Sequence, residues 1–299
     1  MNRIRAYYSP RYTAGGAPLF ARLGQAAALI GANPAVDMVA PQLCGRDQLQ
    51  GLHDAEYLSC FLTGEEPLAS SQGISWSPAI RDATLAMLGG QLEGAAHVMA
   101  HGGVAANLAR GFHHAVPQRG TALCPLNGLA LVAHAMPDKR IVVLDCDEHG
   151  GNGTEEFSAG LPNLYNISIF GTRFGCRGGP RSWALPSRRS DTTTHEYGEA
   201  LAQAESHVAA LRPDLLVYQA GVDCHIKDPK GRTGLTTREL FRRDLRVFRM
   251  AGQQQLPVLF VLAGGYQAPR GVARLNRNTM RAALIATASR GGESQYSVG

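Results

Sequence analysis

The chain has 299 residues, of which 44% are hydrophobic, and it carries a formal net charge of +5. This apolar content supports a sizeable core, and the length is common for one α/β domain. The basic residues form no long block, so the charge does not favour a nucleic-acid partner. The chain starts without an apolar leader and has no apolar run of about 18 residues, so we expect a cytoplasmic protein with no membrane span.

Strand-like and helix-like segments alternate along the chain. In chain order, strands are predicted at residues 4–9, 36–40, 104–108, 140–144, 164–170, 214–220 and 257–262. Helices are predicted at residues 17–30, 56–62, 78–101, 125–136, 194–211, 236–250 and 270–289. Residues 171–190 are predicted to form a long loop rich in Gly, Pro and Arg, and the tail from residue 290 is predicted to be frayed.

This alternation is typical of an α/β fold in which a doubly wound, mostly parallel sheet lies between two helical layers, a three-layer αβα arrangement. The sequence shows no internal repeat and no linker, so we predict one domain over residues 1–299. The six cysteines are scattered without a Cys-x-x-Cys pair, which predicts reduced thiols. Two of them, Cys146 and Cys224, lie beside candidate metal ligands and are predicted to be packing residues.

Carboxylates and an imidazole follow the apolar strand at 140–144. Asp147 and His149 are two residues apart, so they point to the same side if the chain is still extended there. Oxygen and nitrogen donors together suit zinc or a similar divalent ion. Two ligands do not complete a site, and the alternative is a hydrogen-bonded turn before the glycine-rich stretch that follows.

Polar side chains follow three further strands, at His113 and His114, at Asp223, and at Tyr266. The carboxyl ends of parallel strands lie at one edge of a sheet, so these groups can converge. Asp223 would complete the metal site and leave a position open for water and substrate. The two histidines offer a general base and acid near neutral pH, and Tyr266 offers a hydrogen bond to a developing oxyanion. Asp145 could orient one histidine. Taken singly, the histidine pair also fits a structural or surface role, Asp223 fits a turn, and Tyr266 fits a turn with a packed ring.

Five segments of the sequence resemble motifs of the zinc-dependent histone deacetylases and their bacterial relatives. They are the His-His segment at 106–115, Leu-Cys-Pro-Leu-Asn at 123–127, the Asp-rich segment at 145–154, Tyr-Gln-Ala-Gly-Val-Asp at 218–223 and Gly-Gly-Tyr-Gln at 264–267. The resemblance runs from about residue 53 to residue 267. It is greatest to the compact, class IV-like bacterial members.

The resemblance implies the arginase/deacetylase fold and a set of site residues. Zinc would be held by Asp147, His149 and Asp223. His113 and His114 would form the base and acid pair, oriented by Asp145 and Asn152 respectively, and Tyr266 would hold the oxyanion. Phe112, Leu123 and Gly265 would contact the substrate. A structural potassium ion would lie at the carbonyls of Asp145, Asp147 and His149 and at the Ser168 side chain.

The sequence departs from the family pattern at several positions. Gly150 stands where a second His or a Gln is usual, which predicts a roomier site floor. Leu123 replaces the Phe that usually walls the acyl channel, with Ala122 before it and Gly128 after the motif, which predicts an altered acyl preference. Between residues 156 and 191 the loop carries arginines and no acidic residue; they are Arg173, Arg177, Arg181, Arg188 and Arg189. If these line the site rim, they favour an anionic or neutral substrate over an acetylpolyamine. The alternative is a solvated loop.

We therefore expect a zinc amidohydrolase that removes an acyl group from an acyl-lysine or a small acylated amine. Three alternatives are an acetylpolyamine amidohydrolase, a ureohydrolase-like enzyme with two metal ions, and a catalytically silent acyl-binding protein. His225 argues against the ureohydrolase, since that chemistry typically uses a second Asp at this position. The complete set of candidate catalytic residues argues against a silent protein. The sequence leaves open the oligomeric state and which histidine is the base.

Overall fold

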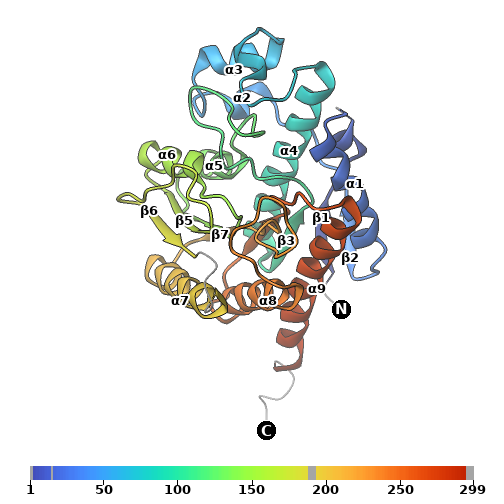
Figure 1. Ribbon diagram of the computed structural model, residues 1–299, viewed down its shortest axis with the longest axis vertical. Helices are drawn as coiled ribbons and strands as arrows, with labels where there is room; N and C mark the ends of the chain where they lie inside the picture. Colours follow the sequence, from blue (N-terminus) through green and yellow to red (C-terminus); the bar gives the residue numbers. More distant parts are fainter. Residues whose placement is uncertain (1–2, 15, 188–192, 294–299) are drawn as a thin grey trace.

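A single eight-stranded sheet forms the centre of the computed structural model, which describes residues 3–14, 16–187 and 193–293 (Figure 1). Its strand order is β2-β1-β3-β8-β7-β4-β5-β6, and every neighbouring pair is parallel. The strands are β1 (Ile4–Tyr7), β2 (Val36–Val39), β3 (Val104–Asn107), β4 (Ile141–Asp145), β5 (Leu164–Phe170), β6 (Ser182–Pro186), β7 (Leu215–Gln219) and β8 (Val258–Val261).

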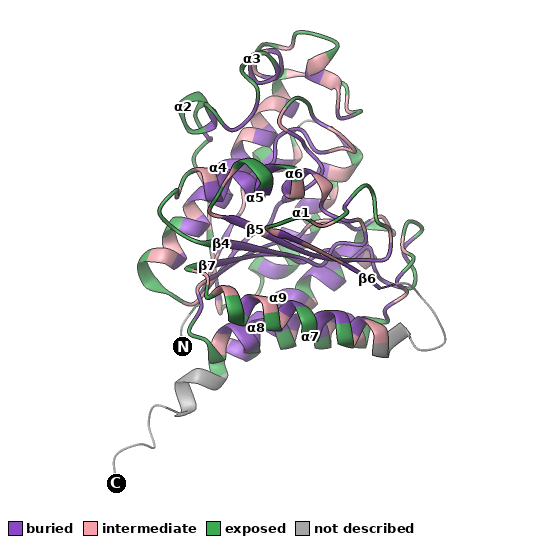
Figure 2. Cartoon of the chain, turned by 90° about the vertical axis from the view of Figure 1, so that its left-hand side faces the viewer, coloured by how far each residue is buried: buried purple, intermediate pink, exposed green. Residues whose placement is uncertain are grey.

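Helices cover both faces of this sheet (Figure 2). The α-helices are α1 (Pro18–Gly31), α2 (Arg46–Leu49), α3 (Ala55–Thr63), α4 (Pro78–His101), α5 (Gly128–His134), α6 (Asn152–Gly160), α7 (Thr193–Leu211), α8 (Thr237–Gln253) and α9 (Pro269–Glu293). Helices α7, α8 and α9 lie on one face, and α4, α5 and α6 lie on the other. The predicted three-layer α/β fold is confirmed.

The central strands are buried on both faces because helices pack on each side. Along β4, Val142 and Leu144 enter the core beneath α7–α9, whereas Ile141 and Val143 enter the core beneath α4–α6. This explains why the strand is a continuous apolar run rather than an alternating one. Residues at the end of such a strand leave the core at the sheet edge, where side chains become available for chemistry.

The strand order places the candidate site. Strands β3, β8, β7 and β4 are consecutive neighbours, and their carboxyl ends lie at the same edge. The segments that follow them carry the histidine pair, Tyr266, Asp223 and the Asp147–His149 pair. Residues more than a hundred positions apart in the chain are thereby brought to one place.

The structure differs from the sequence predictions at β6, at α6 and at α5. The loop predicted at 171–190 contains β6, which pairs with β5 at the sheet edge. Helix α6 begins at Asn152, in a glycine-rich stretch for which the sequence predicts no helix. Helix α5 is shorter than predicted because it begins only after Asn127, whose side chain accepts a hydrogen bond from Ala130 N.

The C-terminal helix is longer than predicted. Helix α9 continues to Glu293, past the point at residue 290 where fraying was expected. It packs against α8 and α1. No helix within the described ranges is both long enough and apolar enough to cross a membrane.

Candidate active site

Three candidate metal ligands meet beyond the ends of β4 and β7. His149 Nδ1 lies 3.3 Å from Asp147 Oδ1 and 3.2 Å from Asp223 Oδ2. All three potential ligand atoms lie within 4.8 Å of one another. In the part of the chain that the structure describes, no other group of His, Cys, Asp and Glu side chains has this geometry.

The donor set fits a divalent cation. Backbone N–H groups hold both carboxylates, since Gly264 N donates to Asp147 Oδ2 at 2.7 Å, His149 N to Asp147 Oδ1 at 3.1 Å and Glu148 N to Asp223 Oδ1 at 3.0 Å. The buried Asp223 Oδ2 accepts no well-aligned hydrogen bond among the described residues, although His149 Nδ1 lies 3.2 Å away. Burial and the charge of Asp147 raise the pKa of Asp223 above its ordinary value. A cation bound by both carboxylates would offset their mutual repulsion and would give Asp223 Oδ2 a partner. Two carboxylate oxygens with one imidazole nitrogen are a donor set that suits zinc.

The loop after β8 approaches these ligands too closely for any side chain at Gly264. A Cβ atom there would lie 2.2 Å from Asp223 Oδ2 and 2.5 Å from Asp147 Oδ2. Glycine therefore lets the backbone N–H of this loop reach a ligand oxygen and carries Tyr266 to the cluster two residues later.

The two histidines are each oriented through Nδ1. His113 Nδ1 lies 2.6 Å from Asp145 Oδ2, and His114 Nδ1 lies 2.7 Å from Asn152 Oδ1. Because an ionised carboxylate and an amide oxygen accept hydrogen bonds, Nδ1 carries the proton and Nε2 is left for chemistry. His113 Nε2 is 3.8 Å from Asp147 Oδ1, so the pair borders the metal ligands.

The two imidazoles differ in basicity. Burial lowers the pKa of His113, but the charges of Asp145 and Asp147 outweigh burial and raise it above the ordinary value. Burial and the neighbouring His113 hold the pKa of His114 well below its ordinary value. The ring centroids are 3.9 Å apart, so only one of these rings readily carries a proton at a time.

Tyr266 borders His149, one of the candidate metal ligands. Its ring meets the His149 ring edge-on, with centroids 6.3 Å apart. Its backbone N donates to Asp228 Oδ2 at 2.7 Å, and Arg110 Nη2 donates to its hydroxyl oxygen at 3.1 Å. Burial raises the pKa of the phenol, so it remains protonated and can donate a hydrogen bond.

The predicted substrate-contact residues lie in different surroundings. Phe112 is only 1% exposed and packs on Phe20. Leu123 is half-buried with a φ of 66°, and Gly265 is buried, its carbonyl accepting a hydrogen bond from Arg22. Sequence reasoning missed the aromatic ring that does border the histidines.

That ring is Phe174, in the loop after β5. It is 44% exposed, and its centroid lies 4.1 Å from that of His114 and 5.8 Å from that of His149. The available signal was an aromatic residue in a glycine-flanked loop at the same sheet edge as the other site residues. Phe174 forms an apolar wall beside the predicted catalytic groups.

The departure at Gly150 does not enlarge the site. A Cβ atom at Gly150 would lie 2.4 Å from the carbonyl oxygen of Arg173 and 2.6 Å from Cys176 Cβ. The 171–178 loop therefore fills the volume that a larger side chain would occupy. The predicted roomier floor is wrong at this position.

Two loop arginines use their guanidinium groups within the structure. Arg173 donates to the carbonyl oxygen of Cys176, and Arg181 donates to the carbonyl oxygens of Ser158 and Ala159. Arg188 and Arg189 lie outside the described residues. Arg173 and Arg181 therefore give little support to the prediction that loop arginines line the rim of the site.

Neither Cys146 nor Cys224 belongs to the metal cluster. Both side chains are buried in the core on the α7–α9 side, and Cys224 Sγ lies 3.2 Å from Arg243 Nη1. Burial raises the pKa of Cys146 to about 12, so it stays a thiol. Their position agrees with packing residues.

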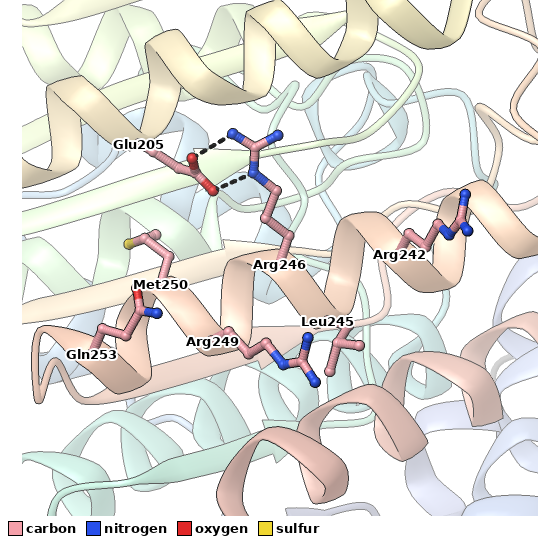
Figure 3. A pocket seen from close by; sticks show the side chains of 7 residues that line it. All are labelled: Glu205, Arg242, Leu245, Arg246, Arg249, Met250 and Gln253. Carbon is pink, nitrogen blue, oxygen red and sulfur yellow. Dashed lines mark hydrogen bonds and ion pairs between the residues drawn. The ribbon is translucent and has the colours of Figure 1, made fainter. Parts of the chain in front are cut away.

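A separate cavity lies between α7 and α8 (Figure 3). Its volume is about 400 Å³, and Arg246 crosses it to bind both oxygens of Glu205. The lining residues are Glu205, Arg242, Leu245, Arg246, Arg249, Met250 and Gln253. None of the candidate site residues lines this cavity.

Comparison with known proteins identifies the family. The chain matches the histone deacetylase domain over residues 20–283. It is 32% identical over 241 residues to an uncharacterized protein of Picosynechococcus sp., covering 76% of this chain and 77% of the relative. It is 30% identical over 205 residues to histone deacetylase 2 of Arabidopsis thaliana, covering 64% and 52%. It is 26% identical over 285 residues to the acetylpolyamine amidohydrolase of Mycoplana ramosa, covering 78% and 82%.

The architecture agrees with these matches. The crystal structure of the acetylpolyamine aminohydrolase from Burkholderia pseudomallei superposes with a TM-score of 0.78 at 20% identity, covering 95% of this chain and 98% of that chain. The chain therefore shares the fold of that enzyme. This chain belongs to the histone deacetylase family. It is therefore an amidohydrolase of the deacetylase type.

Proposed function

We propose that this enzyme is a zinc-dependent deacylase that cleaves the amide bond of an acyl-lysine or a small acylated amine. The observation that carries the proposal is the Asp147–His149–Asp223 cluster, bordered by two oriented imidazoles and a phenol. Such a cluster offers metal ligands, a base, an acid and an oxyanion donor within one small volume. This combination suits acyl transfer to water.

Each side chain has a definite task in the proposed reaction. Zinc, when bound to the cluster, supplies Lewis acidity that polarises an amide carbonyl and acidifies water. The histidine pair takes a proton from the attacking water and returns one to the leaving amine through its Nε2 atoms. Asp145 and Asn152 hold the two rings in the tautomer this requires. Tyr266 donates a hydrogen bond to the carbonyl oxygen as negative charge develops on it.

A binuclear ureohydrolase site is disfavoured by the surroundings of His225. Its Nε2 lies 3.0 Å from Thr237 Oγ1, and its Nδ1 accepts a hydrogen bond from Lys227 N at 3.1 Å. Both ring nitrogens are thus engaged away from the cluster, so His225 does not offer a ligand for a second ion. A silent acyl-binding protein is disfavoured because the described residues include a complete set of catalytic groups.

The charges around Tyr266 favour a substrate with a neutral or anionic body. Lys230 Nζ lies 4.4 Å from the Tyr266 ring centroid. The guanidinium group of Arg110 donates a hydrogen bond to the hydroxyl oxygen of Tyr266. A polyamine would bring further positive charge to this place. The similarity to acetylpolyamine amidohydrolases keeps that substrate class as the main competitor.

A substrate panel separates these two substrate classes. We expect zinc-loaded protein to show a higher kcat/KM for acyl-lysine peptides with neutral or acidic flanks than for N-acetylputrescine and N-acetylspermidine. Raising the salt concentration should weaken the binding of the acidic peptides and leave the binding of the neutral peptides unchanged, because exposed charges are screened over about 10 Å at 0.1 M ionic strength. Acyl chains longer than acetyl are included to probe the effect of Leu123. A clear preference for the acetylpolyamines would overturn the proposed substrate class.

The proposal extends to the whole chain and to a second ion. Residues 1–299 form one catalytic domain, which is supported by a single continuous sheet. A structural potassium ion would bind at the carbonyls of Asp145, Asp147 and His149. Ser168 Oγ, which accepts a hydrogen bond from Gly151 N at 3.1 Å, would be its side-chain ligand. Zinc remains the ion of the chemistry.

A further inference from the structure

Arg110 places a buried guanidinium group inside the candidate site. It follows β3, three residues before His113, and is only 7% exposed. Its Nη2 donates to the Tyr266 hydroxyl oxygen at 3.1 Å, and its Cζ lies 5.7 Å from the Tyr266 ring centroid. Gln91 Nε2 donates to the Arg110 carbonyl oxygen at 2.9 Å, which holds the backbone of this residue in place.

The surroundings of Arg110 are unusual for a buried cation. Buried guanidinium groups are normally paired with carboxylates, because an unpaired buried charge is costly. Arg243 follows this rule, with Nη2 2.8 Å from Asp244 Oδ1. No carboxylate lies within ion-pair distance of Arg110 among the described residues, and its side chain is directed to the phenol of Tyr266 instead. A purely structural role does not explain this choice of partner.

The donor and acceptor roles in this contact determine where the tyrosine proton points. A guanidinium group has only donors, so the phenol oxygen must accept from Arg110. The hydroxyl hydrogen is then left for another acceptor. Tyr266 borders His149 and the metal ligands, where the carbonyl oxygen of a bound amide would lie.

We propose that Arg110 is a positioning residue for the amidohydrolase reaction: it holds the Tyr266 hydroxyl by its oxygen, aims the O–H at the substrate carbonyl and strengthens it as a donor through the adjacent positive charge. This deepens the proposed function and rests on it. The charge of Arg110 lowers the pKa of Tyr266 against the effect of burial, which agrees with a stronger donor. The effect is greatest when negative charge develops on the substrate oxygen, so it acts on turnover more than on substrate binding.

A double-mutant cycle with Tyr266 tests this role. We expect Arg110→Leu to lower kcat about 10- to 100-fold, the range for losing a hydrogen bond to a charged group, with KM changed less than about threefold. If Arg110 acts through the Tyr266 hydroxyl, the double variant Arg110→Leu/Tyr266→Phe should be no slower than Tyr266→Phe alone, within about twofold. Arg110→Lys, which keeps a charged donor, should have an intermediate kcat. A loss from Arg110→Leu that is equally large in the Tyr266→Phe background overturns the proposal.

A binding measurement and a matched control complete the design. Calorimetry measures the binding free energy of a hydroxamate inhibitor, without any turnover. The losses of binding free energy caused by Arg110→Leu and Tyr266→Phe should be non-additive in the same way as their effects on kcat. Arg281→Leu removes another arginine that lies over an aromatic ring, with Cζ 6.0 Å from the Phe241 centroid, and should leave kcat unchanged.

Further measurements distinguish a folding defect from a loss of the role of Arg110, and failure of the proposed function from failure of the proposal for Arg110. Zinc content and melting temperature are measured for every variant, and Arg110→Gln replaces Arg110→Leu in the cycle if the leucine variant does not fold. Absence of turnover by the wild-type protein on every acyl-amide would contradict the proposed function. An additive cycle in an active wild type would contradict only the role of Arg110.

Discussion

Asp223→Ala should abolish tight zinc binding and lower kcat/KM more than about 100-fold, since loss of even the outer partners of metal ligands typically costs 10- to 100-fold. Asp223 Oδ2 is buried without a well-aligned hydrogen bond, and it lies 3.2 Å from His149 Nδ1. Its removal leaves only Asp147 and His149 as side-chain ligands. Zinc content after desalting and kcat/KM on an acetyl-lysine peptide are the measurements.

Asp37→Ala is the matched control for this variant. Asp37 is half-exposed and pairs with Arg5 at 3.4 Å on the sheet edge formed by β1 and β2. It should retain wild-type zinc content and turnover. One equivalent of zinc bound at wild-type affinity in Asp223→Ala would show that the metal site has been assigned to the wrong residues.

Tyr266→Phe should lower kcat about 10²- to 10³-fold while zinc content stays at the wild-type level, because it removes one oxyanion donor and no metal ligand. The ring contact with His149 and the backbone hydrogen bond to Asp228 are both kept in this variant. KM should change little, since the hydroxyl contributes most when charge develops on the substrate oxygen.

Tyr165→Phe provides the control for loss of a hydroxyl elsewhere. Tyr165 lies on β5, where its ring stacks on Trp183 with centroids 6.5 Å apart. Turnover of this variant should match that of the wild type. Near-wild-type turnover of Tyr266→Phe would reduce Tyr266 to a packed ring and remove the oxyanion donor from the mechanism.

Much of the fold follows from local patterns. The apolar runs at 140–144 and 214–220 predicted buried parallel strands, and β4 and β7 lie there. Strand β6 could not be recognised in this way, because Ser182–Pro186 ends in proline and lacks a β-branched residue. An edge strand tolerates a proline because one of its sides needs no hydrogen-bonded neighbour. Pairing with β5 stabilises the extended conformation of β6, which local propensity does not favour.

Helix α6 was missed for a related reason. Glycines at 150, 151 and 153 disfavour a helix, yet α6 begins at Asn152. The Thr154 N–H donates to the His113 carbonyl oxygen at 3.1 Å, and Phe157 is buried beside His53. Tertiary contacts therefore stabilise a helix that the sequence alone does not indicate. The same contacts place Asn152 against His114.

The candidate metal ligands and Tyr266 could be predicted from the sequence, whereas the residues that surround them could not. Polar residues directly after buried strands must emerge at one sheet edge, and this holds for Asp147, Asp223 and Tyr266. The residues around them depend on how loops fold back, which no local pattern encodes. Phe112 turns into the core while Phe174 faces the histidines, and the loop of Phe174 occupies the space opposite Gly150.

Titration of metal-free protein with zinc tests the central claim most directly. Hydrolysis of a fluorogenic acetyl-lysine peptide is followed as zinc is added in fractions of an equivalent, and bound metal is measured in parallel. A single-ion site held by Asp147, His149 and Asp223 predicts activity that rises linearly and reaches its plateau at one zinc per chain. Full activity in the exhaustively metal-free protein, or a plateau only at two ions per chain, would contradict the account.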